Sequence, residues 1–522
     1  MWHMPGHTYS RLKRYHDAVW QQEASARVDH AHMMRDRVLP DQIHNFAHNN
    51  EWLIRNLIHI GRAQDAIDLA KNMIDLPRHP KYNTLKKRGS ANYGRMRLIG
   101  SLQSFQMWDE VLNIANTRYL ETTGEEKDDL ERQTLIGVAK FQTGDVMGGC
   151  DVLTEMMQSH QKLEQEQKAK GDEAAQKARE DKKDDKAIDK ARKDAERTFD
   201  SRLRNLSKGI RELKGQLHLA FRAYEDALAE FEKVTGFDKG ELARIQVLAG
   251  QTKKGLETIK KHVEKSEKET IPLAQSVAVN WLAGEKEKAK ESFESLREIS
   301  SAVDLQAPIF AQLAPIAKEL GFENDWKLPR EIPEDFGERP TLDSLGPFRW
   351  SPSPAKPWSL ADHLGKEFSL NDYAGKPVIV IFYLGYGCLH CAEQLQAFAP
   401  MTEKFNEAGI DVVAISTDNK EDLKISHENY QEGKFPFPLV ANPELDVFKA
   451  YRCYDDFENQ TLHGTFLINP EGLVLWQDIS YEPFMEAEFL LKEAKRLLAP
   501  ATTKRETLQT NVAPPSDADA GE

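Results

Sequence analysis

Two cysteines three positions apart carry the clearest chemical signal in this chain. Cys388 and Cys391 enclose Leu389 and His390 in a Cys-x-x-Cys sequence. Only a thiolate attacks efficiently, and the free N–H groups and dipole of a helix N-terminus lower a thiol pKa. A second thiol one turn away can then attack a sulfenate or mixed disulfide on the first. We therefore expect Cys388 to be the nucleophile and Cys391 the resolving thiol.

The sequence around this pair predicts alternating strands and helices. The apolar run 378–383 predicts a central strand covered on both faces, followed by a loop at 385–387. A helix is then expected from Cys388, with a core face formed by Leu395, Phe398, Met401 and Phe405. An edge strand is expected at 365–370, further strands at 411–416, 438–441, 465–469 and 473–477, and helices at 421–430 and 483–498. These elements predict one α/β domain over residues 355–500.

This region resembles the peroxiredoxin-like redoxins, the alkyl hydroperoxide reductase/thiol-specific antioxidant family of the thioredoxin superfamily. The matching stretches, in family order, are 368–377, 382–391, 415–418, 435–439 and 465–472. The resemblance implies a thioredoxin fold and a thiol-dependent peroxidase of antioxidant type that needs an external thiol reductant. We expect no cofactor and no metal ion.

Some positions depart from the family pattern. Peroxiredoxins carry Thr three residues before the reactive cysteine, where this chain has Gly385, and a nearby proline is also missing. The family's arginine before the late strand is replaced, and His463 is a candidate for part of its peroxide-binding role. The thioredoxin branch has a cis-proline in this region, which His463-Gly464 does not offer. Both a peroxide and a protein disulfide, reduced by thiol–disulfide exchange, therefore stay open as substrates.

The cysteines allow other interpretations. Four cysteines in 522 residues exclude a disulfide scaffold and leave local roles only. A Cys-x-x-Cys pair can be half of a zinc site, although no second pair completes it here. The protein can also be a non-catalytic scaffold, in which the redoxin domain is degenerate and the repeats carry the function. Cys453 is either an inert structural cysteine or an additional resolving thiol, and Cys150 is expected in a helical core.

The preceding residues predict one helix after another, broken at glycine-centred turns. Leu248-Ala-Gly250 and Leu282-Ala-Gly284 lie about 34 residues apart, which is the tetratricopeptide period. Ala18, Ala66 and Ala227 are expected where paired helices cross closely. We predict a multidomain chain in which an all-α tetratricopeptide-like solenoid precedes the α/β thioredoxin-fold domain. The predicted parts are repeats at 1–160, a charged helical spacer or projecting arm at 161–208, and repeats at 209–325.

The remaining segments and the composition bear on partners. Residues 326–354 predict a proline-rich linker, and 501–522 a disordered polar tail. A solenoid offers a concave surface, so we expect a protein partner there. The net charge of −14 argues against nucleic acid, and no apolar run reaches the ~20 residues of a membrane span. The start lacks a signal peptide and is expected to lie inside a repeat, so we expect an upstream segment; cytoplasmic and exported or periplasmic locations both stay open.

Histidine is concentrated near the start of the chain. Half of the 16 histidines lie within residues 1–60, including those of Asp29-His-Ala-His32. His44 and His48 are four residues apart, a spacing that puts two histidines on one helix face and can hold a metal ion. Repeat packing or contact with a partner is the favoured interpretation of this segment, and its role stays open.

Overall fold

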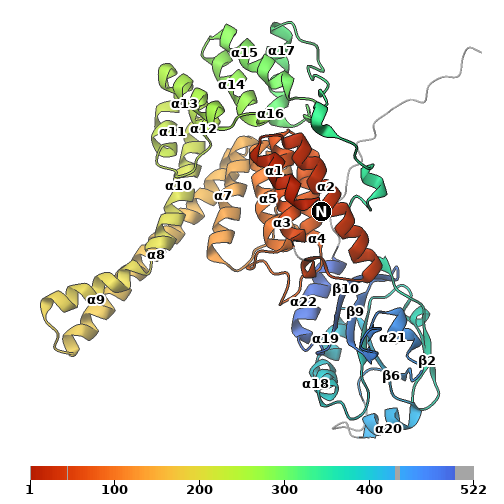
Figure 1. The fold of residues 1–522 in the computed structure, drawn as a ribbon. Helices are drawn as coiled ribbons and strands as arrows, with labels where there is room; N and C mark the ends of the chain where they lie inside the picture. Colours follow the sequence, from red (N-terminus) through yellow and green to blue (C-terminus); the bar gives the residue numbers. More distant parts are fainter. Residues whose placement is uncertain (1, 44, 429–434, 500–522) are drawn as a thin grey trace, which may run out of the picture.

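The computed structural model describes residues 2–43, 45–428 and 435–499. An N-terminal helical region is followed by an α/β domain, as the sequence predicted (Figure 1). None of the helices within the described residues is long and apolar enough to cross a membrane. The predicted tail at 501–522 and the end of the helix predicted at 421–430 lie outside the described residues.

The helical region is built from successive helices that pack in pairs. Gly250 and Gly284, with φ of +77° and +78°, lie in the turns within two successive pairs, where the sequence repeat falls. Ala18, Ala66 and Ala227 have no exposed surface, as close helix crossings require. The tetratricopeptide assignment and the domain boundaries stay predictions. The helices are α1 (His3–Arg11), α2 (Tyr15–Asp36), α3 (Phe46–His59), α4 (Ala63–Asp75), α5 (Ser90–Ser104), α6 (Trp108–Ile114), α7 (Glu126–Gln142), α8 (Val146–Glu180), α9 (Asp185–Arg197), α10 (Asp200–Ala220), α11 (Tyr224–Phe231), α12 (Lys239–Leu248), α13 (Thr252–Lys265), α14 (Thr270–Leu282), α15 (Lys286–Glu298), α16 (Pro308–Ala311) and α17 (Ala314–Glu319), with short 3₁₀ turns η1 (Pro40–Gln42), η2 (Glu334–Phe336) and η3 (Leu342–Ser344).

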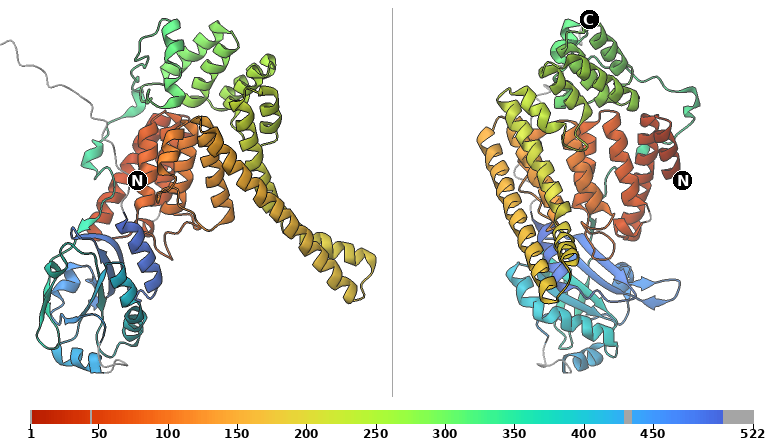
Figure 2. Two further views of the ribbon diagram at one scale, coloured as in Figure 1. Left: turned by 180° about the vertical axis from the view of Figure 1, so that it is seen from behind. Right: turned by 90° about the vertical axis from the view of Figure 1, so that its left-hand side faces the viewer.

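The charged segment forms an arm that projects from the other helices (Figures 1 and 2). Helix α8 packs against α9 and α10 in this arm. Small side chains at Ala175 and Ala178 and the bare backbone of Gly171 are buried, which lets the helices approach closely. Charged pairs such as Lys193–Asp189, at 2.7 Å, face water. The expected spacer is therefore an ordered helical hairpin.

The C-terminal domain is built on a six-stranded mixed sheet in the order β1-β10-β9-β4-β5-β6. Strand β4 (Val378–Tyr383) pairs in parallel with β5 (Asp411–Ser416), and both match the predicted bounds. On its other side β4 pairs antiparallel with β9 (His463–Ile468). The other elements are β1 (Ser353–Pro354), β2 (Ser359–Ala361), β3 (Glu367–Ser369), β6 (Leu439–Ala441), β7 (Tyr454–Asp455), β8 (Gln460–Thr461), β10 (Leu473–Ser480), α18 (Leu389–Phe398), α19 (Thr402–Glu407), α20 (Lys420–Glu428), α21 (Asp446–Ala450) and α22 (Ala487–Leu498), with η4 (Leu370–Tyr373) and η5 (Ala399–Met401).

The short strand expected at 365–370 is present as β3, at the edge of a small sheet and not of the main one. Strand β3 pairs with β2 in a separate two-stranded sheet, because Asp362 accepts N–H groups of Leu364 and Lys366 and closes a local hairpin. The edge strands of the main sheet are β6 and β1. Strand β1 lies within residues 326–354 and pairs with β10.

Helices cover both faces of the sheet, which explains the continuous apolar run of β4. Ile379 and Ile381 face a core shared with α18, α19 and α22, while Val380 and Phe382 face a second core that includes α21. The helix expected after Cys388 is divided into α18, η5 and α19. Pro400 divides it, because proline donates no N–H and its ring clashes with the preceding turn. The four predicted core residues, Leu395, Phe398, Met401 and Phe405, are all buried.

The α/β domain packs on the helical region through β10 and α22 (Figure 1). Trp476 is fully buried; its Nε1–H donates to the Arg78 carbonyl oxygen at 2.6 Å, and its ring stacks on His79. The Glu493 carboxylate accepts the Arg78 backbone N–H at 2.7 Å. These buried polar contacts hold the two parts in one relative orientation.

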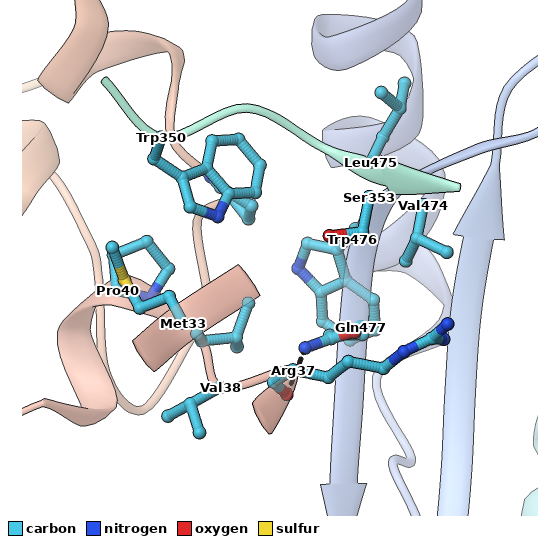
Figure 3. A pocket seen from close by; sticks show the side chains of 12 residues that line it. Met33, Arg37, Val38, Pro40, Trp350, Ser353, Val474, Leu475, Trp476 and Gln477 are labelled. Carbon is cyan, nitrogen blue, oxygen red and sulfur yellow. Dashed lines mark hydrogen bonds between the residues drawn. The ribbon is translucent and has the colours of Figure 1, made fainter. Parts of the chain in front are cut away.

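A crevice lies beside this junction (Figure 3). Met33 and Trp350 line it on one side, and Trp476 and Gln477 on the other. The Gln477 amide donates to the Arg37 carbonyl oxygen across it. The crevice belongs to the domain junction, because residues of the helical region and of the α/β domain both line it. None of these residues is part of the dithiol region.

The proline-rich segment 326–354, named the strap below, lies against α2. Arg330 and Arg339 of the strap reach the buried carboxylate of Asp17 at 3.0 and 3.2 Å. The buried ring of His30 lies 3.1 Å from the Pro347 carbonyl oxygen through its Nδ1. The strap is therefore docked along its length on the first helices, and this docking adds to the contacts that hold the two parts together.

Candidate active site

Cys388 and Cys391 lie where β4 leads into α18. They are joined in a disulfide with a Cα–Cα distance of 5.3 Å. Cys388 is the N-cap of α18, and its Sγ accepts the backbone N–H of Cys391 at 3.3 Å. Cys391 is 1% exposed, whereas Cys388 is only partly buried. Solvent therefore reaches Cys388 first; the roles of nucleophile and resolving thiol stay predictions.

The loop before Cys388 is shaped by two glycines and a carboxylate. Gly385 and Gly387 have φ of +89° and +94°, a backbone region that favours glycine. The Tyr386 N–H donates to both carboxylate oxygens of Asp418 at 2.9 Å, and burial raises the pKa of Asp418. A Cβ on Gly385 would overlap the Asp418 carboxylate. The threonine of the family pattern therefore has no room in this loop conformation.

Strand β9 brings His463 against both sulfur atoms. Gly464 pairs with Phe382 near the end of β4, so the next residue along β9 lies beside the dithiol. The Nε2 of His463 is 3.2 Å from the Cys391 Sγ and 4.0 Å from the Cys388 Sγ. The sequence made His463 a candidate for part of the role of the family arginine; the structure places it against Cys391, the predicted resolving thiol.

The protonation of His463 follows from its partners. Its Nδ1 lies 2.8 Å from the Tyr481 carbonyl oxygen, which only accepts hydrogen bonds, so Nδ1 carries the hydrogen. The lone pair of Nε2 then faces the sulfurs. Burial lowers the pKa of His463, which keeps the ring neutral near pH 7. The Nε2 lone pair is therefore available as a hydrogen-bond acceptor beside the Cys391 Sγ.

Hydrogen bonds of Gln394 and Leu384 connect the elements that form the site. The buried amide of Gln394 donates to the Thr465 Oγ1 and the Phe484 carbonyl oxygen, both at 3.1 Å, and so joins α18 to β9. The Leu384 N–H approaches the Cys391 Sγ at 3.3 Å. Sequence reasoning did not single out Gln394, Asp418 or Tyr481. Only Asp418 had a signal, since it lies within the family-like stretch 415–418.

The other candidates lie apart from this chemistry. The His390 side chain is 65% exposed and lies 3.3 Å from the Glu393 carboxylate, so it points to solvent. Cys453 is fully buried in the core on the opposite face of the sheet from Cys391, and burial raises its pKa. It therefore cannot resolve Cys388 in this fold. Cys150 is only partly buried where it packs on a helical core.

The site also has metal-ligand residue types. Potential ligand atoms of Cys388, Cys391 and His463 lie within 4.8 Å of one another. The sulfurs are bonded to each other in the disulfide and become thiolate ligands only after reduction. Within the described residues this group has three members, one fewer than a structural zinc site uses.

Fold and site together define a thioredoxin-fold dithiol domain. Residues 353–477 match the model of the AhpC/TSA family. Peroxiredoxin Q, chloroplastic, of Sedum lineare is 33% identical over 144 residues, 27% of this chain and 74% of that protein. Thioredoxin peroxidase of Fasciola hepatica is 31% identical over 156 residues, 28% of this chain and 77% of that protein. The crystal structure of Enterococcus faecalis AhpC is 19% identical and covers 28% of this chain and 89% of its own, with a TM-score of 0.26.

The chain belongs to the AhpC/TSA family through its C-terminal domain. Its enzyme class is that of the thiol-dependent peroxidases. The matched residues include both cysteines of the dithiol and His463, while the helical region precedes the match.

Proposed function

We propose that this protein reduces a peroxide at Cys388 and resolves the oxidised sulfur with Cys391. The observation that carries the proposal is the position of His463, whose Nε2 faces the buried Cys391 Sγ at 3.2 Å. Cys388 is the partly exposed sulfur at the helix N-terminus, where a backbone N–H already contacts it. A thiolate at that position is stabilised by the same N–H and by the helix dipole.

The reaction balances with these groups. The Cys388 thiolate attacks one peroxide oxygen, the O–O bond breaks, and the departing oxygen takes up a proton and leaves as an alcohol or water. The sulfur has lost two electrons and is now a sulfenic acid. Cys391 gives its proton to His463 and attacks the sulfenic sulfur; an S–S bond forms, and the departing hydroxide takes that proton as water. An external thiol then reduces the disulfide.

We further propose that the helical region is a platform for a protein partner. Support comes from the junction, where Trp476 and Glu493 bind the backbone of Arg78 in a buried contact. Because the strap is also docked, a partner held by the helices would meet the dithiol at a constant position. Repeated helix pairs commonly offer such concave surfaces.

Thiol–disulfide exchange with a protein is the second candidate. Tyr386 and Leu389 flank Cys388 in the chain and are 53% and 70% exposed, so two large side chains are open to contact by a polypeptide beside the reactive sulfur. Gly385 and His463 also replace the threonine and arginine of the peroxidase pattern. Both observations favour a polypeptide disulfide over a peroxide.

Mass spectrometry after one equivalent of hydrogen peroxide, with rapid thiol trapping, tests these proposals. For the peroxidase we expect a Cys388–Cys391 disulfide in the wild type and a trapped sulfenate on Cys388 in Cys391→Ser. Cys453→Ser is the matched control and should behave as the wild type. If the thiols stay reduced under peroxide but exchange with an insulin-type disulfide, the peroxidase proposal is wrong and the protein is a thiol–disulfide exchange enzyme. Inertness in both assays, with partner binding retained in Cys388→Ser, would instead favour a non-catalytic scaffold.

A further inference from the structure

Three histidines gather on the first helices, far from the dithiol in sequence. His3 and His7 are four residues apart on α1, so they share one helix face. His48 projects from α3, which packs against α1. The sequence had drawn attention to His44 and His48 as a pair; His44 lies outside the described residues, and the fold gives His48 two different neighbours.

The ring nitrogens of these histidines converge. One nitrogen from each of the three rings lies within 4.8 Å of the others, and the Nε2 atoms of His3 and His7 are 3.1 Å apart. Two imidazoles bound to one tetrahedral Zn²⁺ at ~2.0–2.1 Å place their nitrogens about 3.3 Å apart. The observed separation is therefore close to that of a shared ion.

Neighbouring residues orient the histidine rings and keep them in the neutral form that binds a metal ion. The His3 Nδ1 lies 3.1 Å from the Asn49 Oδ1, which accepts its hydrogen, so the lone pair of His3 is on Nε2, the atom that faces His7. The rings of His7 and Trp52 pack nearly at right angles, with centroids 4.4 Å apart. Burial, followed by the charges of His3 and His48, lowers the pKa of His7 to about 4. Burial also lowers the pKa of His48, so the neutral, metal-binding form dominates at pH 7.

We propose that His3, His7 and His48 bind one divalent transition-metal ion, with Zn²⁺ as the ion that fits best. Three neutral imidazoles suit Zn²⁺, and water would complete a four-coordinate site, because all three side chains are only partly buried. The ion would join α1 to α3 and so fasten the first helix of the chain. Glu51 on α3 adds favourable negative charge near His7 and His48, against the opposing charges of Arg11 and Arg55.

The test is a metal titration of the intact chain without an added histidine tag. The protein is kept in its disulfide form, so that Cys388 and Cys391 cannot bind the ion. Co²⁺ serves as the spectroscopic probe, and we expect one equivalent to give the visible absorption of a four-coordinate ion. One equivalent of Zn²⁺ should then remove that absorption. Zn²⁺ should also raise the melting temperature of the wild type.

Glutamine variants locate the site. His7→Gln and His48→Gln should each weaken binding by at least about 100-fold, since even outer-shell changes cost roughly 10–100-fold. His32→Gln is the matched control, because His32 is an exposed histidine of the neighbouring helix α2 and should leave the titration unchanged. Melting in the presence of a chelator shows whether each variant is folded.

Several results would overturn the proposal. One is a wild-type chain that shows no four-coordinate Co²⁺ absorption or binds the ion only in proportion to its total histidine content. Another is retention of the stoichiometric site in both His7→Gln and His48→Gln while each melts like the metal-free wild type. If one variant fails to fold, the other decides, because the two residues lie on different helices.

Discussion

Replacing His463 with glutamine removes the proposed base while keeping a hydrogen-bonding side chain of similar reach. The imidazole Nε2 is 3.2 Å from the Cys391 Sγ and 4.0 Å from the Cys388 Sγ. A glutamine amide can contact the same sulfur but cannot accept a proton from it near pH 7. The change should therefore slow formation of the disulfide much more than the first reaction with peroxide.

The size of the effect follows from the thiol chemistry. An unassisted thiol with a pKa near ~8.5 is only about 3% thiolate at pH 7, and the burial of Cys391 disfavours the anion further. General-base assistance contributes ~10²–10⁴-fold. We expect disulfide formation to slow by about 100- to 1,000-fold in His463→Gln, or roughly 3–4 kcal/mol in the barrier. Attack by Cys388 should change by less than about 10-fold, since the helix N-terminus supplies its main stabilisation.

The assay is rapid quenching after one equivalent of peroxide, with a sulfenic-acid trap and mass spectrometry. The variant should accumulate sulfenate on Cys388, and its resolution rate should rise about tenfold per pH unit while the Cys391 thiol ionises. In the wild type the rate of disulfide formation should stop rising with pH once His463 is neutral. Because burial lowers the pKa of His463, this plateau should begin below the pH at which a free histidine titrates. His390→Gln, in the exposed histidine of the same motif, is the control. Equal disulfide rates in His463→Gln and the wild type at pH 7 would refute the role of the imidazole.

Three further changes test the loop, the junction and the strap. Gly385→Thr should destabilise the α/β domain by about 2–3 kcal/mol and abolish peroxide reduction. Gly387→Ala should cost only about 1 kcal/mol, because a Cβ on Gly387 would meet open space. Thermal unfolding measures both changes in stability. Trp476→Phe should leave the Arg78 carbonyl oxygen unpaired at a cost of about 1–3 kcal/mol and raise proteolysis between the two parts. Burial lowers the pKa of His30 to about 4, so native His30 stays neutral while the unfolded chain takes up a proton below pH ~6.5. The free energy of unfolding of the wild type should thus fall by up to about 3 kcal/mol between pH ~6.5 and ~4. The melting temperature of His30→Gln should therefore fall less than that of the wild type over this pH range.

Each of these expectations has a contradicting result. An active Gly385→Thr enzyme would show that the loop can move away from Asp418. Unchanged proteolysis in Trp476→Phe would mean that the other junction contacts, such as Glu493 with the Arg78 N–H, and the strap hold the two parts together without this hydrogen bond. Parallel melting curves against pH for His30→Gln and the wild type would show that His30 is not protonated on unfolding in this range.

The local pattern of the sequence determined much of the α/β domain. The bounds of β4 and β5 were predictable because strands buried on both faces carry near-continuous apolar runs: β4 is apolar throughout, and β5 is apolar between Asp411 and Ser416. The start of α18 at the dithiol followed from the change in hydrophobic period after the Gly385-Tyr-Gly387 loop. These features depend on neighbours in the chain, so a single sequence records them.

Tertiary structure alone decided which distant groups meet. His463 lies 72 residues beyond Cys391, and the register of β9 on β4 brings the two together. The same sheet puts Cys453 on the far face, and the packing of α1 on α3 joins His48 to His3 and His7. Such contacts depend on strand register and helix packing over the whole domain. They leave no periodic or local trace in the sequence, so only the folded chain could show them.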